Sequence, residues 1–244
     1  MDNQTVFRVL HSYNESALVN MATDKALASS FKNGDKPILR FYSWEKSYTV
    51  GISQKPESYE NFYKQYNGNC AKRVSGGGVL FHGHDISYSL VLPTTFLGEL
   101  NVKQSYEKIC SFLLRFYNNL NLKANYAKDI DTIQLSKSDF CQVGYEAYDI
   151  IINGIKMGGN AQKRSKNMIF QHGSIPLFRV DNTIELGHSL EEIGVQLSYG
   201  EAIEKLTTAF KETFGVQLED SILNDTERDC LQQLLKDTND STKQ

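Results

Sequence analysis

The chain has 244 residues, of which 40% are hydrophobic and 23% charged, with a formal net charge of -3. This composition is typical of a globular protein with a core, and the length suits one large domain or two small ones. The weak negative charge excludes a general attraction to nucleic acid. The N-terminus lacks a signal peptide, and no apolar run reaches the ~20 residues that span a bilayer. We therefore expect a cytoplasmic protein that does not use a membrane.

Helix and strand patterns alternate through the first half of the chain. Residues 12–31 predict an amphipathic helix, because Ser12 and Glu15 have the spacing of a capping box. The alternation of apolar residues with serine over 86–91 is typical of a half-buried strand. Residues 38–52 predict two strands joined by a turn. Further strands are expected over 70–74 and 79–91, on either side of a run of three glycines.

The second half of the chain adds a hairpin and three helices. Asn153-Gly154 is a strong hairpin signal, because both central residues of such a turn need positive φ. It predicts that residues 146–152 pair with residues 155–162. The other expected elements are helices over 102–120, from Ser198 to Gly215 and over 226–236, and a strand over 168–177.

This order of helices, strands and hairpins predicts an α+β fold, with a mostly antiparallel β-sheet flanked by helices. No repeat or linker interrupts the chain, so we expect a single catalytic domain over residues 1–236 and a disordered polar tail over 237–244. The four cysteines lie far apart and form no CxxC pair. Free thiols are therefore expected, rather than disulfides or a zinc site.

A glycine run, Arg73-Val-Ser-Gly-Gly-Gly-Val-Leu-Phe-His82, is the first candidate for chemistry. The glycines leave a backbone that a ligand can touch, and their N–H groups could bind an oxyanion or a phosphate. Arg73 could pair with a carboxylate or a phosphate. A plain turn between strands explains the run equally well. The spacing matches neither a Walker loop nor GxGxxG.

Three histidines lie near these motifs. His82 and His84 share one face of a predicted strand, but two ligands with no third nearby are too few for a metal. We therefore expect no metal site, and we place His82 at a pocket rim, where it orients a side chain or the backbone. His172 ends an apolar strand and could act as a base or bond to the backbone.

Lys156 follows the hairpin turn directly. A lysine in this position is ordinarily solvated and inert. Here it stands between an apolar strand and a run of small residues, where an ammonium could stabilise a developing oxyanion. We expect Lys156→Ala to abolish activity and leave the fold intact, because a lysine on a pocket rim contributes little to packing. The small residues are Gly158, Gly159, Asn160 and Ala161.

Cys141 differs from the other three cysteines. A free cysteine is most often a small buried hydrophobe, which fits Cys70, Cys110 and Cys230. Cys141 instead lies in a polar loop directly before the lysine hairpin. A thiol attacks thioesters well, but only as the thiolate, and so it needs a nearby cation. Lys156 is a candidate for that cation.

Five stretches of the chain, in order, resemble the catalytic domain shared by lipoate–protein ligases, biotin ligases and the octanoyl transferases of lipoate assembly. The stretches begin at Asn20, Leu39, Arg73, Gly154 and Gln171, and they read NMATDKA, LRFYSW with VGISQ, RVSGGG, GIKMGGNAQ and QHGSI. The resemblance implies an α+β fold with a tunnel for an acyl chain.

The same resemblance implies roles for residues in these motifs. Lys156 would contact the acyl carbonyl, and Cys141 and Lys156 would be the catalytic pair. The implied substrate-binding residues are Arg73, Ser75, Gly76, Gly77, Gly78, His82, Gly158, Gly159, Asn160, Ala161 and His172.

Within the family, the loop that starts at Cys141 is similar to the motif of cysteine-dependent octanoyltransferases and lipoyl-domain amidotransferases. The cysteine, a tyrosine and an acidic residue are in register over CQVGYEAYDI. The chain also lacks the Asp-Leu-Gly-Asn that usually follows the ligase histidine, and it is too short for the accessory domain of many ligases. Two features point away from that branch. The triple glycine with a serine before it resembles the ligases, and Gln142 stands where the branch usually has a phenylalanine.

The leading hypothesis is transfer of an octanoyl or lipoyl group through a thioester on Cys141. Octanoyl acyl carrier protein would be the donor. The acceptor would be a lysine on a lipoyl carrier domain, of the glycine cleavage H protein or 2-oxo acid dehydrogenase E2 type, and no cofactor would be needed. One alternative is an ATP-dependent lipoate ligase that uses magnesium and lipoate, in which Cys141 is incidental. The other is a non-catalytic module that binds lipoate or a lipoylated partner.

Overall fold

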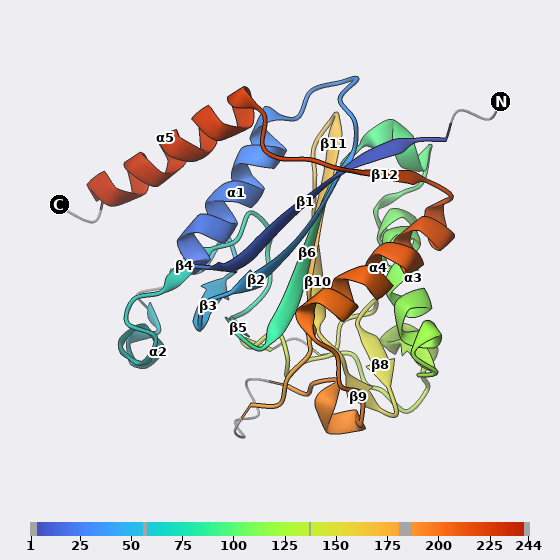
Figure 1. The fold of residues 1–244 in the computed structure, drawn as a ribbon. Coiled ribbons are helices and arrows are strands. Elements are labelled where there is room, and N and C mark those ends of the chain that lie inside the picture. The colour runs from blue at the N-terminus through green and yellow to red at the C-terminus, as the bar shows by residue number, and fades with distance from the viewer. Residues whose placement is uncertain (1–3, 56–57, 137, 181–186, 242–244) are drawn as a thin grey trace.

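The computed structural model describes residues 4–55, 58–136, 138–180 and 187–241 (Figure 1). A six-stranded sheet of order β10-β11-β6-β2-β1-β12 forms its centre. The four strands from β10 to β2 pair antiparallel, whereas β1 pairs in parallel with β2 and β12. The strands are β1 (Val6–Glu15), β2 (Ile38–Trp44), β6 (Asp85–Pro93), β10 (Gly159–Arg164), β11 (Met168–Pro176) and β12 (Gln217–Asp220).

Two small sheets and five helices surround the main sheet. The small sheets contain β3 (Ser47–Val50), β4 (Cys70–Lys72) and β5 (Leu80–His82), and β7 (Ala124–Tyr126), β8 (Ile150–Ile152) and β9 (Ile155–Lys156). The helices are α1 (Ala17–Ser30), α2 (Glu60–Gln65), α3 (Val102–Asn119), α4 (Tyr199–Phe214) and α5 (Asp225–Ser241). Helices α1 and α5 lie on one side of the main sheet and α3 and α4 on the other (Figure 1). The predicted α+β architecture is therefore confirmed.

Strand β6 is buried on both faces, and this differs from the predicted half-buried strand. Its residues Ile86, Tyr88, Leu90 and Leu92 join the large apolar core with α3 and α4. The alternating serines face the other way but are covered as well. Ser89 donates to the buried carboxylate of Asp24 in α1 at 2.8 Å, so the polar pattern marks a hydrogen-bonded face rather than a solvated one.

The N-terminal segment contains the largest departure from the predicted elements. Residues 6–15 form β1, so the first four residues of the helix predicted over 12–31 belong to a strand, and α1 begins only after Ser16. The Ser16 hydroxyl accepts from the Val19 N–H at 3.3 Å, so Ser16 and not Ser12 is the helix cap. Phe7 and Val9 are buried against the core by the two-residue period of the strand.

The predicted hairpin is confirmed at its turn, where Asn153 and Gly154 have φ values of 52° and 79°. It is wrong in its length, because the second strand divides after Lys156. Strand β9 stays with β8, while β10 crosses to the main sheet and pairs with β11. Gly158 permits the crossing, since its φ is 81° and a Cβ there would lie 1.9 Å from the Ser174 carbonyl oxygen.

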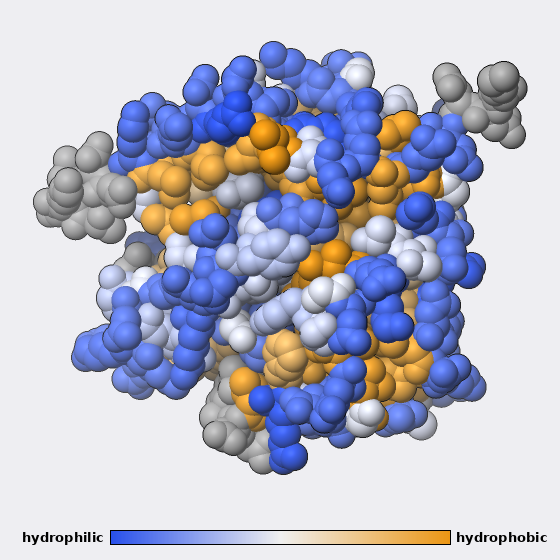
Figure 2. Space-filling model, viewed as in Figure 1, coloured by the Kyte–Doolittle hydropathy of each residue, from blue (hydrophilic) through white to orange (hydrophobic). Residues whose placement is uncertain are grey.

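The last helix is longer than expected. Helix α5 ends at Ser241, beyond the predicted end at 236, so residues 237–241 of the predicted disordered tail are helical; residues 242–244 lie outside the described chain. Its start is tied to β1 by an ion pair between Arg8 and Glu227 at 2.6 Å. Hydrophilic side chains cover the outer side of α5 in Figure 2, and hydrophobic ones lie along its inner side.

Three short elements were not expected, namely α2, β7 and β12. Strand β12 is a polar edge strand with three of its four residues exposed, so it carries no apolar alternation to detect. Among the described residues, the structure has no helix of the length and apolar character needed to span a bilayer.

Candidate active site

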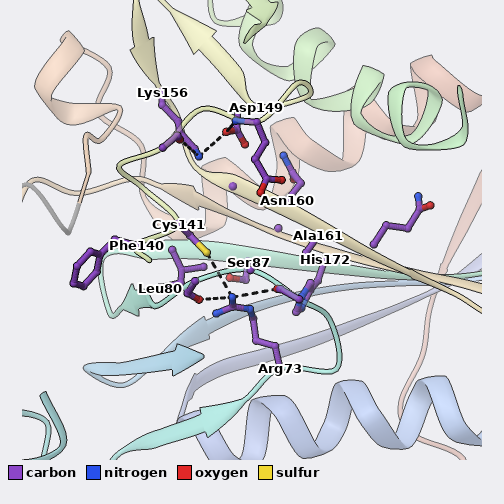
Figure 3. A pocket seen from close by; sticks show the side chains of 18 of the residues that line it. Arg73, Leu80, Ser87, Phe140, Cys141, Asp149, Lys156, Asn160, Ala161 and His172 are labelled. Atoms are coloured by element: carbon purple, nitrogen blue, oxygen red, sulfur yellow. Dashed lines mark hydrogen bonds and ion pairs between the residues drawn. The ribbon is translucent and has the colours of Figure 1, made fainter. Parts of the chain in front are cut away.

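A cavity of about 290 Å³ collects most of the residues singled out from the sequence (Figure 3). Cys141 and Lys156 both line it, although they come from different elements. Of the predicted substrate-binding residues, Ser75 and Gly158 do not line it. Those that do are Arg73, Gly76, Gly77, Gly78, His82, Gly159, Asn160, Ala161 and His172.

Backbone hydrogen bonds place Cys141 beside the glycine run. The Cys141 N–H donates to the Val79 carbonyl at 2.8 Å, and the Val79 N–H donates to the Asp139 carbonyl at 2.7 Å. Gly78 makes this approach possible, since a Cβ on it would lie 2.1 Å from the Asp139 oxygen. One function of the glycines is therefore close packing against the cysteine loop.

Arg73 is the cation beside the thiol. Its Nη2 lies 3.5 Å from the Cys141 sulfur and donates to the Gly78 carbonyl at 2.6 Å. A Cβ on Gly77 would lie 2.9 Å from Nη2 and 3.2 Å from the sulfur, so only glycine leaves room for this contact. Arg73, and not Lys156 as predicted, is thus the cation that contacts Cys141. The Arg73 and Cys141 side chains point toward each other in Figure 3.

Lys156 is buried and already paired. Its ammonium lies 2.6 Å from Asp149 Oδ2 and donates to the Gly144 carbonyl at 2.7 Å, and only 6% of the residue is exposed. The expectation of a rim lysine with little part in packing is therefore wrong. Burial raises the pKa of Asp149, although the adjacent ammonium acts in the opposite direction. An ammonium has three N–H donors, so one remains for a ligand.

His82 lies in a buried polar chain rather than at an open rim. Its Nε2 lies 2.9 Å from Thr49 Oγ1, and its Nδ1 lies 3.0 Å from Asp85 Oδ2. The Trp44 ring stacks on it with centroids 3.8 Å apart. Burial lowers the pKa of His82, which favours the neutral ring despite the nearby Asp85 carboxylate. His84 does not line the cavity, and its Nε2 has no hydrogen-bond partner among the described residues.

His172, which also lines the cavity, makes a second chain of the same kind. Its Nε2 lies 2.5 Å from Ser75 Oγ, and its Nδ1 lies 3.6 Å from Asp24 Oδ2. Asp24 also accepts from Arg40 at 2.8 Å and from the Tyr42 hydroxyl at 2.9 Å. This network joins α1 to the sheet, and it explains why Ser75 is buried behind the cavity wall rather than on it.

Asp85 is expected to make unfolding pH-dependent in strong acid. Burial raises the pKa of Asp85, but His82, His84 and the Ser174 hydroxyl outweigh it and bring the pKa from 3.8 to about 2. The carboxylate therefore stabilises the fold above pH 3.8, and the contribution is lost as the pH falls through 2. The shift corresponds to about 2 kcal/mol.

Urea unfolding of the wild type and of Asp85→Asn between pH 5 and pH 2 measures this contribution. The wild type should lose more unfolding free energy than the variant over that range. Parallel pH curves for the two proteins would contradict the assignment to Asp85.

Some residues on the cavity wall were not found from the sequence as site residues. Asp149 lies in the loop motif that starts at Cys141, where it was noted only as an acidic residue in register. The other wall residues were given no role either, although most of them lie inside the motifs or the glycine run described above. They include Met21, Tyr42, Trp44, Leu80, Ser87, Tyr106, Phe140, Glu146 and Gln162.

Comparison with known proteins decides the family. The family model of the lipoyl protein ligase A/B catalytic domain matches residues 16–211. The chain belongs to this family. The predicted relationship is thereby confirmed. Among the described residues, no group of three or more histidine, cysteine, aspartate or glutamate side chains is arranged to hold a metal ion.

The chain is similar to known proteins both in sequence and in structure. The chain is 27% identical to octanoyltransferase LipM of an Exiguobacterium species, over 88% of this chain and 89% of that protein. It is 31% identical to LipM of Clostridioides difficile, over 74% and 69% respectively. In structure it resembles lipoate-protein ligase A bound with ATP, with a TM-score of 0.78 and 21% identity over 96% and 94% of the two chains. This structural similarity shows that the chain and lipoate-protein ligase A share a fold.

Proposed function

We propose that this protein is an octanoyltransferase of lipoate assembly that works through a thioester on Cys141. The observation that carries the proposal is the contact between the Cys141 sulfur and the Arg73 guanidinium on the wall of the cavity that Lys156 also lines. A guanidinium stabilises a thiolate, and a thiolate is the form of cysteine that attacks thioesters. The names of the curated relatives support octanoyl transfer as the overall reaction.

The cavity suits an acyl chain that ends in a reactive carbonyl. Its polar groups include Cys141, Arg73 and Lys156, and they come with a set of apolar side chains that an alkyl chain can contact. Lys156 is held by Asp149 and the Gly144 carbonyl in a fixed position, so its remaining N–H is preorganised as a donor to an oxyanion. The apolar side chains on the wall are Met21, Tyr42, Trp44, Leu80, Tyr106 and Phe140.

The reaction then proceeds in two balanced steps. In the first, the Cys141 thiolate attacks the carbonyl of octanoyl acyl carrier protein, the carbon–sulfur bond to the carrier breaks, and the carrier leaves as a thiolate that takes a proton from water. In the second, the ε-amine of a lysine on a lipoyl carrier domain attacks the new thioester. An amide forms, the amine loses a proton, and the Cys141 thiolate is released. Because a thioester is already activated, neither step needs ATP or magnesium.

A lipoyl carrier domain is the acceptor that fits this chemistry. A Thermoplasma acidophilum structure of the same fold is described as a bipartite lipoate protein ligase and its E2 lipoyl domain, with a TM-score of 0.77 and 21% identity. We propose the same class of acceptor here, from a glycine cleavage H protein or a 2-oxo acid dehydrogenase E2, and a cytoplasmic location.

Incubation with octanoyl acyl carrier protein in the absence of ATP tests the proposal. Intact mass spectrometry should show one octanoyl adduct, and peptide mapping should place it on Cys141. Addition of a lipoyl carrier domain should remove the adduct and octanoylate one carrier lysine. Lipoyl transfer that needs ATP and forms no adduct would instead identify a ligase. The absence of both reactions would leave a binding module.

A further inference from the structure

The hydrogen bonds behind Arg73 form one continuous chain that ends on a buried carboxylate. Arg73 Nη1 donates to Thr49 Oγ1 at 2.9 Å, and that oxygen lies 2.9 Å from His82 Nε2. His82 Nδ1 lies 3.0 Å from Asp85 Oδ2. None of the four residues is more than 5% exposed, so water competes little for these bonds.

The donors in this chain all point in the same direction. A guanidinium can only donate, so Arg73 uses a lone pair of Thr49 Oγ1. The single hydrogen of the hydroxyl is then available for His82 Nε2, and the imidazole proton lies on Nδ1, facing Asp85. The neutral ring that burial favours fits this arrangement. The chain therefore runs from a cation to an anion through two neutral groups.

This separation leaves the charge of Arg73 available to the sulfur. Among the described residues, Arg73 has no ion pair with a carboxylate, and besides the Cys141 sulfur its guanidinium bonds to backbone carbonyls and to the Thr49 hydroxyl. A direct salt bridge would offset the positive charge next to the thiol. Neutral partners fix the position of the guanidinium without doing so.

The far end of the chain is anchored in the main sheet. Asp85 Oδ2 accepts from Ser87 Oγ at 3.1 Å and from Ser174 Oγ at 2.6 Å, which fixes the carboxylate between β6 and β11. Trp44 of β2 stacks on His82 and fixes the plane of the ring. The loop that carries Arg73 is thus connected to the rigid centre of the fold.

We propose that Thr49 and His82 are positioning residues that hold the Arg73 guanidinium against the Cys141 sulfur. The proposal deepens the proposed function, since it assigns two residues that prepare the nucleophile of that reaction. Thr49 is fully buried and is not among the described residues of the cavity wall, so it acts through Arg73 rather than on a substrate.

The test compares Thr49→Val with Thr49→Ser, which keeps the hydroxyl. The rate of alkylation of Cys141 by iodoacetamide is measured against pH without any acyl donor, by mass spectrometry of the peptide that carries Cys141. Thr49→Val should react about three- to tenfold more slowly at pH 7, with its profile displaced to higher pH. Thr49→Ser should react within about twofold of the wild type.

Other charged groups do not confound this comparison. Lys156, Asp149, Glu146 and His172 also line the cavity, and neither variant changes them. A Thr49→Val profile equal to that of the wild type would overturn the proposal, even with a lower melting temperature, because a purely structural role lowers stability alone. If Thr49→Val does not fold, His82→Phe removes both ring nitrogens, interrupts the same chain one link further on and should give the same displacement.

The result is independent of whether Cys141 forms a thioester. A displaced alkylation profile without an octanoyl adduct would support the positioning role and reject the proposed transfer. An octanoyl adduct with an unchanged alkylation profile would support the proposed transfer and reject the positioning role.

Discussion

Replacing Cys141 with serine is expected to lower octanoyl transfer by about 10³-fold or more and to eliminate the octanoyl adduct. A serine hydroxyl stays protonated near neutral pH, and the neighbouring guanidinium cannot supply the base that it would need. The partly exposed thiol lies in a loop outside the apolar core, so the melting temperature should change little. Transfer from octanoyl acyl carrier protein to a lipoyl carrier domain, followed by mass spectrometry, measures the effect.

Cys230→Ser is the matched control for this variant. Cys230 is also partly exposed, but it lies on α5 and not on the cavity wall. It should transfer octanoate at the wild-type rate. If Cys141→Ser also kept that rate, the thioester route would be wrong. Lipoylation that survives Cys141→Ser and requires ATP would favour the ligase in its place.

The elements that were predicted well are those that local sequence determines. The Asn153-Gly154 turn needs two residues that accept positive φ, and the helix from Ser198 to Gly215 has a capping box and a left-handed glycine at its ends. At the N-terminus, the spacing of Ser12 and Glu15 favours a helix start, and pairing with β2 and β12 makes residues 6–15 a strand instead. Long-range pairing of that kind leaves no local pattern.

The same distinction applies to the candidate site. The motif residues were expected near one pocket, and most of them do line one cavity. The contact of Arg73 with Cys141 joins residues 68 positions apart, so spacing could not reveal it. The nearer lysine was the natural candidate for the cation, but Asp149 and a backbone carbonyl occupy two of its donors. Partner choice inside a cavity depends on side-chain geometry that the sequence does not contain.

Lys156→Met is expected to lower octanoyl transfer by about 10²–10³-fold and to destabilise the fold as well. The activity falls because the preorganised oxyanion donor is lost. The stability falls because Asp149 is left buried without its cation, which costs about 3 kcal/mol in comparable buried pairs. Transfer kinetics and urea unfolding measure the two effects separately.

The stability loss should depend on pH in a defined direction. The pKa of Asp149 is already raised by burial, and removal of Lys156 raises it further, so the folded variant binds a proton that the unfolded chain releases above pH 3.8. The variant should therefore lose stability relative to the wild type as the pH rises above the raised pKa that Asp149 has in the folded wild type. Adding Asp149→Asn removes the buried charge and should recover stability without recovering transfer. Recovery of both would show that Lys156 acts only through packing, and a Lys156→Met protein of wild-type stability would contradict the buried pair.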